Sequence, residues 1–287
     1  MNNQREFNGK VVWITGASSG IGRSLALAYA ATGARLILSG RRTDALAEVA
    51  RDCGDSTVHV IPFDLADLDC IPSKVNDALA CFGHVDIMVH NAGLAARDRV
   101  VSTSREVHQR ILHANYLGPA LLTQSLLPSM FERGGGQFVV VSSVLGAFGG
   151  PLLAAYSASK HALHGFFESL RAEEHDRGIV VTMVVPGFIK TDITAHALTG
   201  SGACFGRVLS IYHNAMTADE CARQILIAVA CQSAEVVIGG IDTWMLHLKR
   251  WFPRLHAVVI RSHPVRVRNR MFGWIPVLGR RWRTATT

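Results

Sequence analysis

Cysteine is scarce in this sequence and never takes the Cys-x-x-Cys spacing of zinc ligands. The six cysteines lie at positions 53, 70, 81, 204, 221 and 231. This scatter argues against a structural zinc site and against a disulfide framework. The 13 histidines form no convincing metal site either, so we predict that no metal is bound. A reduced, cytoplasmic protein is expected.

An apolar leader is also missing, because residues 1–9 are polar and predict no signal peptide. Two uncharged stretches, 111–131 and 134–159, have the length of a membrane span. The first contains Asn115 and other polar residues, and the second is interrupted by glycines and Pro151. We expect a buried helix in the first and a strand followed by a loop in the second, with membrane spans as the alternative.

Acidic residues almost disappear from the end of the chain. Residues 242–287 contain ten Lys/Arg and one Asp, a net charge of +9, and four of the five tryptophans. Residues 1–241 contain 19 Lys/Arg and 21 Asp/Glu, a net charge of −2. The basic character therefore belongs to an extension, and it does not predict that the main domain binds nucleic acid. We predict a domain over residues 8–241 and a basic, Trp-rich extension over residues 242–287.

Apolar runs alternate with helical patterns along the main domain, and 49% of all residues are hydrophobic. This alternation is typical of a parallel sheet covered by helices on both faces. The expected strands are residues 10–14, 35–39, 58–63, 85–90, 137–142, 179–185 and 235–238. The predicted fold is α/β, a single doubly wound Rossmann domain with a seven-stranded parallel sheet.

A glycine-rich turn follows the first expected strand, in the sequence Thr15-Gly16-Ala17-Ser18-Ser19-Gly20-Ile21-Gly22. A helix is expected from Arg23 to Ala31. Strand, glycine turn and helix together place a pyrophosphate at a helix N-terminus, where glycines let the backbone approach it. The spacing Gly-x-x-x-Gly-x-Gly differs from the usual Gly-x-Gly-x-x-Gly. It still predicts a dinucleotide site.

Tyr156 and Lys160 are four residues apart, so a helix would place both side chains on one face. A nearby cation favours the phenolate and lowers the pKa of a tyrosine, which can then exchange a proton with an alcohol or carbonyl oxygen. Ser143, thirteen residues upstream, can hold that oxygen by a hydrogen bond. Ser142 is the rival candidate, since neighbouring strand residues point to opposite faces.

Together these motifs resemble the short-chain dehydrogenase/reductase family, over about residues 8–240. The matching motifs are Thr15 to Gly22, Asn91-Ala92-Gly93, Ser143 with Tyr156 and Lys160, and Pro186-Gly187 with Thr191. His90 is a departure, because the family usually has an asparagine there. The resemblance implies a catalytic set of Asn115, Ser143, Tyr156 and Lys160, in which Asn115 anchors a water between Lys160 and solvent and Lys160 holds the nicotinamide ribose.

The resemblance also implies a cofactor site. Its residues are Gly16, Ser18, Ser19, Gly20, Ile21, Gly22, Arg41, Arg42, Asp64, Leu65, Asn91, Ala92, Gly93, Tyr156, Lys160, Pro186, Gly187, Ile189 and Thr191. NAD enzymes place an acid near the end of the second strand, whereas this chain has Gly40 followed by Arg41 and Arg42. Because guanidinium groups pair well with a 2′-phosphate, we predict NADP(H) as the cofactor.

The predicted activity is the NADP(H)-dependent interconversion of an alcohol and a ketone or aldehyde. Ser143, Tyr156 and Phe188 are the expected substrate contacts. The loop over residues 188–217 is rich in apolar residues, which suggests a lipid or steroid-like substrate, although the same residues could simply pack the loop. Alternatives are a non-catalytic cofactor-binding scaffold that acts through the extension, and a nucleic-acid-binding extension. An enoyl reductase is disfavoured, because that group spaces its Tyr and Lys further apart.

Two kinds of association are expected. The largely apolar helices over residues 107–131 and 155–170 resemble those through which family members pair, and predict a homodimer or tetramer. In the extension, Trp244, Met245, Leu248, Trp251 and Phe252 share one helical face up to Pro253. A second apolar run, 271–278, precedes further arginines. These features favour peripheral docking on an anionic membrane, and the alternative is packing against the domain to close the substrate pocket.

Overall fold

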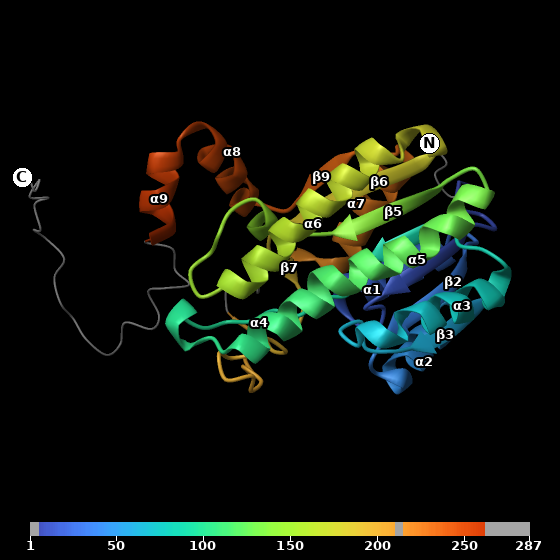
Figure 1. Ribbon diagram of the computed structural model, residues 1–287, viewed down its shortest axis with the longest axis horizontal. Coiled ribbons are helices and arrows are strands. Elements are labelled where there is room, and N and C mark those ends of the chain that lie inside the picture. The colour runs from blue at the N-terminus through green and yellow to red at the C-terminus, as the bar shows by residue number, and fades with distance from the viewer. Residues whose placement is uncertain (1–5, 210–214, 262–287) are drawn as a thin grey trace, which may run out of the picture.

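Seven parallel strands form one sheet in the computed structural model (Figure 1), which describes residues 6–209 and 215–261. The strands are β1 (Val11–Thr15), β2 (Arg35–Gly40), β3 (Val58–Pro62), β4 (Ile87–His90), β5 (Gly136–Val141), β6 (Ile179–Pro186) and β9 (Glu235–Ile238). Their order is β3-β2-β1-β4-β5-β6-β9, and every neighbouring pair is parallel. The prediction of seven parallel strands is confirmed, with ends that differ by at most two residues.

The strand order reverses between β1 and β4. The chain runs outward from β1 through β2 to β3, and then returns to the other side of β1 for β4, β5, β6 and β9. In a doubly wound sheet, such a reversal leaves a crevice beyond the carboxyl ends of the strands, where ligands bind. These ends lie at the left of the sheet in Figure 1.

Helices cover both faces of the sheet, because successive strand residues point to opposite sides. Val12 and Ile14 of β1 pack in the cluster formed with α1 (Gly20–Ala30), α2 (Thr43–Asp52) and α7 (Ala218–Ala230). Val11 and Trp13 belong to the opposite cluster. That cluster includes α3 (Ile71–Phe82), α5 (Gly118–Glu132) and α6 (Ala154–Glu173), and α4 (Arg105–Leu112) packs beside α6.

The two uncharged stretches are interior segments of this fold. The first is the end of α4, a π-helical turn over His113–Leu117, and α5. The second contains β5, a loop and the start of α6. Within residues 6–209 and 215–261, none of the helices combines the length and hydropathy that crossing a membrane requires.

The extension begins with two short helices, α8 (Trp244–Trp251) and α9 (Pro253–Arg261). Pro253 ends α8 as predicted, but it also starts α9, a helix that the sequence pattern did not indicate. Met245 and Leu248 are buried against Val144, Phe148 and Val185. The predicted apolar face of α8 is therefore divided, because part of it packs on the domain. The predicted second apolar run, 271–278, lies outside the described residues.

Within the described residues of the predicted substrate loop, 188–209 and 215–217, the regular pieces are short. β7 (Ile189–Lys190) and β8 (Met216–Thr217) form a small parallel pair at its two ends. Ile211 and Tyr212 of this loop lie outside the described residues.

Candidate active site

A cavity of about 850 Å³ lies beyond the carboxyl ends of the strands. It is lined by the glycine turn after β1, the loops after β2 to β6, the start of α6, and residues of α8 and α9. Of all site residues predicted from the sequence, only Gly22 and Asn115 do not line it. The fold therefore gathers the predicted cofactor, substrate and proton-transfer residues around one space.

The first turns of α6 carry Tyr156 and Lys160 on one face. The Lys160 Nζ atom lies 5.7 Å from the centre of the Tyr156 ring and donates a hydrogen bond of 2.8 Å to the Val141 carbonyl at the end of β5. Lys160 is only 4% exposed, and this burial lowers its pKa to about 8. At pH 7 the side chain is still mostly protonated, so it places a positive charge beside Tyr156.

Two serines follow β5, which ends at Val141, one residue earlier than predicted. Because both serines lie beyond the strand, the alternation of strand residues does not separate them. The Ser142 hydroxyl donates to the Lys160 carbonyl at 3.4 Å, and the Ser143 hydroxyl accepts from the Leu145 N–H at 3.2 Å. Both line the cavity. Ser143 remains the candidate for holding a substrate oxygen. Its hydroxyl only accepts in the contact with Leu145, so its hydrogen is still available, whereas the Ser142 hydroxyl donates its hydrogen to the Lys160 carbonyl.

Asn115 is fully buried in the π-helical turn between α4 and α5. Its side chain accepts from the Leu94 N–H at 2.7 Å and donates to the Leu94 carbonyl at 2.8 Å and the Ser159 hydroxyl at 2.9 Å. The amide is thus occupied with structural contacts. Pro119 has no N–H, which deprives the Asn115 carbonyl of the donor it would have in a regular α-helix.

The glycine turn is tightly packed against the loop after β4. A Cβ on Gly16 would lie 2.8 Å from the Ala92 Cα, and a Cβ on Gly22 would lie 2.3 Å from the Gly16 carbonyl oxygen. Asn91 fastens the turn by donating to the carbonyls of Thr15 and Gly16 at 3.0 and 3.2 Å. The turn leads directly into α1, whose first N–H groups have no intrahelical partner and suit a phosphate.

The cavity wall next to the end of β2 is basic. Arg42 donates to the Ser18 hydroxyl at 3.2 Å, and both Arg41 and Arg42 are exposed at the cavity wall. A Cβ on Gly40 would have no neighbour closer than 3.7 Å, so packing does not require glycine at this position. The backbone therefore leaves room for an acid here, and the chain has none.

Asp64 lies beside these arginines and forms an ion pair with Arg110 of α4. Burial acts to raise the pKa of the Asp64 carboxyl. The hydrogen bond from the Ala66 N–H and the charge of Arg110 outweigh burial and hold the pKa below its usual range. Asp64 is consequently a carboxylate at the cavity wall, available to accept a hydrogen bond.

The sequence pattern missed Asp242 as a site residue. Its carboxylate accepts from the Phe188 N–H at 2.6 Å and the Gly240 N–H at 3.1 Å. A Cβ on Gly187 would lie 1.9 Å from the same carboxylate, so this glycine allows the contact. Asp242, the one acidic residue of the basic extension, thus fixes the loop after β6. Its position as a single acid among basic residues was the sequence signal that could have identified it.

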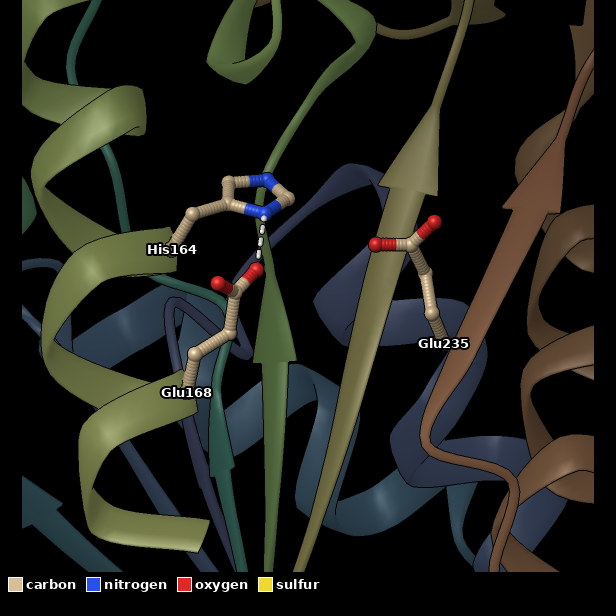
Figure 2. A group of neighbouring side chains, drawn as sticks. All are labelled: His164, Glu168 and Glu235. Atoms are coloured by element: carbon tan, nitrogen blue, oxygen red, sulfur yellow. Dashed lines mark hydrogen bonds and ion pairs between the residues drawn. The ribbon is translucent and has the colours of Figure 1, made fainter. Parts of the chain in front are cut away.

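One side-chain group on the outer surface could approach a cation. Figure 2 shows His164 and Glu168 on α6 facing Glu235 of β9. The His164 Nδ1 lies 3.4 Å from a Glu168 carboxylate oxygen, and that glutamate side chain is 55% exposed. None of the three residues lines the cavity. The group therefore does not contribute to the chemistry of the cavity, and the absence of a metal stays a prediction.

Comparisons with known proteins agree with this geometry. The sequence model of the family described as short chain dehydrogenase matches residues 10–201. The chain belongs to the short-chain dehydrogenase family. It is 39% identical to a Drosophila melanogaster protein named "Dehydrogenase/reductase SDR family protein 7-like", over 93% of this chain and 84% of that protein. It is 38% identical to the Rattus norvegicus "Dehydrogenase/reductase SDR family member 7B", over 88% and 80%.

Solved structures of two dehydrogenases have a similar fold. A short-chain dehydrogenase from Streptomyces avermitilis superposes with a TM-score of 0.74 at 29% identity, covering 88% of this chain and all of that chain. An alcohol dehydrogenase from Thermococcus sibiricus, complexed with 5-hydroxy-NADP, gives 0.71 at 25% identity, covering 82% and 98%. As a short-chain dehydrogenase, the chain is an oxidoreductase of a family that uses a nicotinamide cofactor on small-molecule substrates.

Proposed function

We propose that this short-chain dehydrogenase interconverts an alcohol and a ketone or aldehyde with NADP(H), on an apolar substrate. The observation that carries the proposal is the grouping of Tyr156, Lys160 and Ser143 at the wall of one cavity, with the glycine turn at the same cavity. When bound, the cofactor would supply or accept the hydride. The protein's own residues would position the oxygen and move the proton.

Tyr156 is the proton donor in reduction and the acceptor in oxidation. Ser143 donates a hydrogen bond to the substrate oxygen, which stabilises the negative charge that develops there. Lys160 keeps a positive charge near the Tyr156 ring and so stabilises a tyrosinate electrostatically. Burial of both side chains, at 9% and 4% exposure, reduces screening of this interaction by water.

Asn115 would act through its backbone rather than through its amide. Its amide is occupied by Leu94 and Ser159, whereas Pro119 withholds the α-helical partner of its carbonyl. We infer, from the family resemblance, that this carbonyl accepts from a water that connects Lys160 to solvent. In this way the proton given up by Tyr156 could be replaced.

The preference for NADP(H) rests on charge at the end of β2. Arg41 and Arg42 stand at the cavity wall, and Gly40 supplies no carboxylate that would repel a 2′-phosphate. A tightly held phosphate at this point gains charge-assisted hydrogen bonds, which are roughly twice as strong as neutral ones.

An apolar substrate is supported by the other end of the cavity. Beyond Ser143 and Tyr156 the lining is largely hydrophobic and includes Val144, Leu145, Phe148, Leu153, Ile193, Ala197, Trp244, Met245, Val259 and Ile260. Such a wall favours burial of hydrocarbon by about 25 cal/mol for each Å² removed from water.

The decisive experiment measures NADPH consumption against a panel of lipidic ketones, aldehydes and sterols. Tyr156→Phe should lower turnover by roughly 10²–10⁴-fold, because it removes only the exchangeable proton. Tyr29→Phe is the matched control, since Tyr29 is also buried and its hydroxyl has no partner among the described residues. Near-full turnover by Tyr156→Phe would refute the proton-donor role. No hydride transfer with any substrate would favour the non-catalytic scaffold instead.

We also propose a homodimer or tetramer, on the basis of the family resemblance. The apolar side chains of α5 and α6 that do not enter the core, such as Leu121, Leu127 and Phe166, are half-buried within one chain. The described residues of these two helices expose no large hydrophobic side chain, so the single-chain structure adds no separate support for pairing. A monomer mass by light scattering at micromolar concentration would overturn this proposal.

Residues 242–287 are further proposed to contact an anionic membrane without crossing it, as their basic and aromatic composition favours. The packing alternative has support as well, since Met245 and Leu248 are buried on the domain. Deleting everything after Gly240 would therefore expose part of the core. It would also remove Asp242, whose carboxylate holds the loop after β6 at Phe188. Substitutions on exposed positions give a cleaner test than truncation.

A further inference from the structure

The helix α9 forms part of the wall at the apolar end of the cavity. Val259 and Ile260 line the cavity from one side of the helix, and His256 is buried on that side against the Phe148 ring at 5.1 Å. α8 contributes Trp244 and Met245 to the same wall. Since an α-helix with its side chains is about 10 Å across, the side of α9 that faces away from this wall lies only about that far from the cavity.

The other side of this pair of helices is apolar and exposed. Trp251, Phe252, Leu255 and Val258 are 71%, 62%, 52% and 58% exposed, and we call these four residues the outer face. None of them lines the cavity. Figure 1 shows α8 and α9 as a hairpin that projects from the sheet and its covering helices. Large apolar side chains gathered in this way mark a surface for a partner or a membrane.

Charge selects between those two occupants. The segment 244–261 contains no acidic residue, and its Arg250, Arg254 and Arg261 are exposed, whereas its Lys249 donates to the Ala147 carbonyl of the domain. A second copy of the chain, docked through the same face about a twofold axis, would bring these positive charges together. An anionic lipid surface complements them, because each basic residue near such a surface adds about 1 kcal/mol to binding. Exposed aromatics beside arginines also suit the boundary between headgroups and acyl chains.

We propose that the α8–α9 hairpin docks on an anionic bilayer through its outer face, and that the substrate is a membrane-resident alcohol or ketone that reaches the cavity from the bilayer past this hairpin. The proposal rests on the oxidoreductase function proposed above. It adds the source of the substrate and the residues that govern its delivery. Lipid molecules then need not cross water, since the docked face and the cavity wall belong to the same two helices.

The first test measures binding of the full chain to phosphatidylcholine vesicles with and without phosphatidylserine. A variant carrying Trp251→Ser, Phe252→Ser, Leu255→Ser and Val258→Ser should bind at least about tenfold more weakly, because it removes the apolar area that would enter the bilayer. The matched control is Val100→Ser with Val101→Ser, two residues that are 67% and 85% exposed elsewhere on the surface. The control should bind like the parent chain.

The charge component is tested separately with Arg250→Gln and Arg254→Gln. This pair should weaken binding to the phosphatidylserine vesicles and leave the already weak binding to neutral vesicles unchanged. Added salt should act in the same direction. Equal binding by the parent chain and the outer-face variant overturns the docking proposal. A lipid-free mass that falls by half in the outer-face variant also overturns it, because the face would then join two copies.

The second test compares turnover of a ketone carried in the vesicles with turnover of a small water-soluble ketone. The outer-face variant should keep its activity on the soluble ketone, since the substituted residues do not line the cavity, and should lose most activity on the vesicle-borne one. Equal loss on both substrates overturns the delivery route. If the parent chain reduces neither ketone, the oxidoreductase proposal and the route fail together, whereas the vesicle binding still decides the docking by itself.

Discussion

His90 should make this protein sensitive to mild acid. The ring is fully buried, stacks on Phe138 at 6.0 Å, and uses Nε2 to contact the Thr123 hydroxyl at 2.8 Å. Its Nδ1 is buried without a partner among the described residues. Burial lowers the pKa of His90 from 6.5 to about 3. The folded protein therefore holds a neutral imidazole at pH values where the unfolded chain would bind a proton.

The size of the effect follows from this difference in pKa. Above pH 6.5 His90 is neutral in both the folded and the unfolded chain, so the free energy of unfolding has its full value. As the pH falls below 6.5 the unfolded chain binds a proton that the folded protein does not, and the free energy of unfolding decreases. Between pH 7 and pH 5 the loss is about 2 kcal/mol, and by pH 3 it reaches about 4 kcal/mol. Two kcal/mol is a large share of the stability of a typical domain.

The measurement is the free energy of unfolding in urea at pH 7, 6 and 5. His90→Asn introduces the residue that the family pattern has at this position and removes the titrating group. The variant should be less stable than the parent chain at pH 7, because the smaller side chain leaves a cavity beside Phe138. Between pH 7 and pH 5, however, its free energy of unfolding should fall by about 2 kcal/mol less than that of the parent chain. His175→Asn, at an exposed position, should keep the pH dependence of the parent chain. Equal slopes for His90→Asn and the parent chain would refute the reasoning.

Three further predictions concern the cofactor site. Arg41→Ala should weaken NADPH binding about tenfold or more and leave NADH binding nearly unchanged, as titration calorimetry would show, and equal losses would contradict it. Gly16→Ala should lower both the melting temperature and the affinity for NADPH, because Gly16 has a φ of +66° and an added Cβ would lie 2.8 Å from the Ala92 Cα. The control Gly149→Ala should change neither quantity, since an added Cβ there has no neighbour within 4 Å. Asp242→Ala should raise the KM for NADPH about tenfold by releasing the loop after β6, with partial recovery in Asp242→Asn; an unchanged KM would remove Asp242 from the site.

Local spacing explains the features that the sequence predicted well. Short continuous apolar runs mark strands such as β1 and β5, because both faces of a parallel sheet are covered by helices and both sets of side chains are buried. Tyr156 and Lys160 fall on one side of α6, because residues four apart share a helical face. The glycine turn between β1 and α1 is also a local pattern, since positive φ angles and close backbone contacts require glycine. Each of these depends on neighbours within a few residues.

The prediction for α8 shows the limit of such reasoning. The sequence pattern predicted a helix limited by Pro253, and it placed Met245 and Trp251 together on one apolar face. In the structure Met245 is 6% exposed and Trp251 is 71% exposed. Periodicity tells which residues lie on one side of a helix, but the surface that the helix meets decides which of them are buried.

Contacts between distant segments were decided only by the tertiary structure. Asp242 reaches Phe188, 54 residues away, and Arg110 pairs with Asp64, 46 residues away. Neither pair has a spacing that a helix or strand period would bring together. The sequence by itself thus determined the strands, the glycine turn and the Tyr-Lys pair. Packing of whole elements decided that the extension would supply both a loop anchor and a cavity wall, because long-range contacts depend on how the sheet and its helices close around one space.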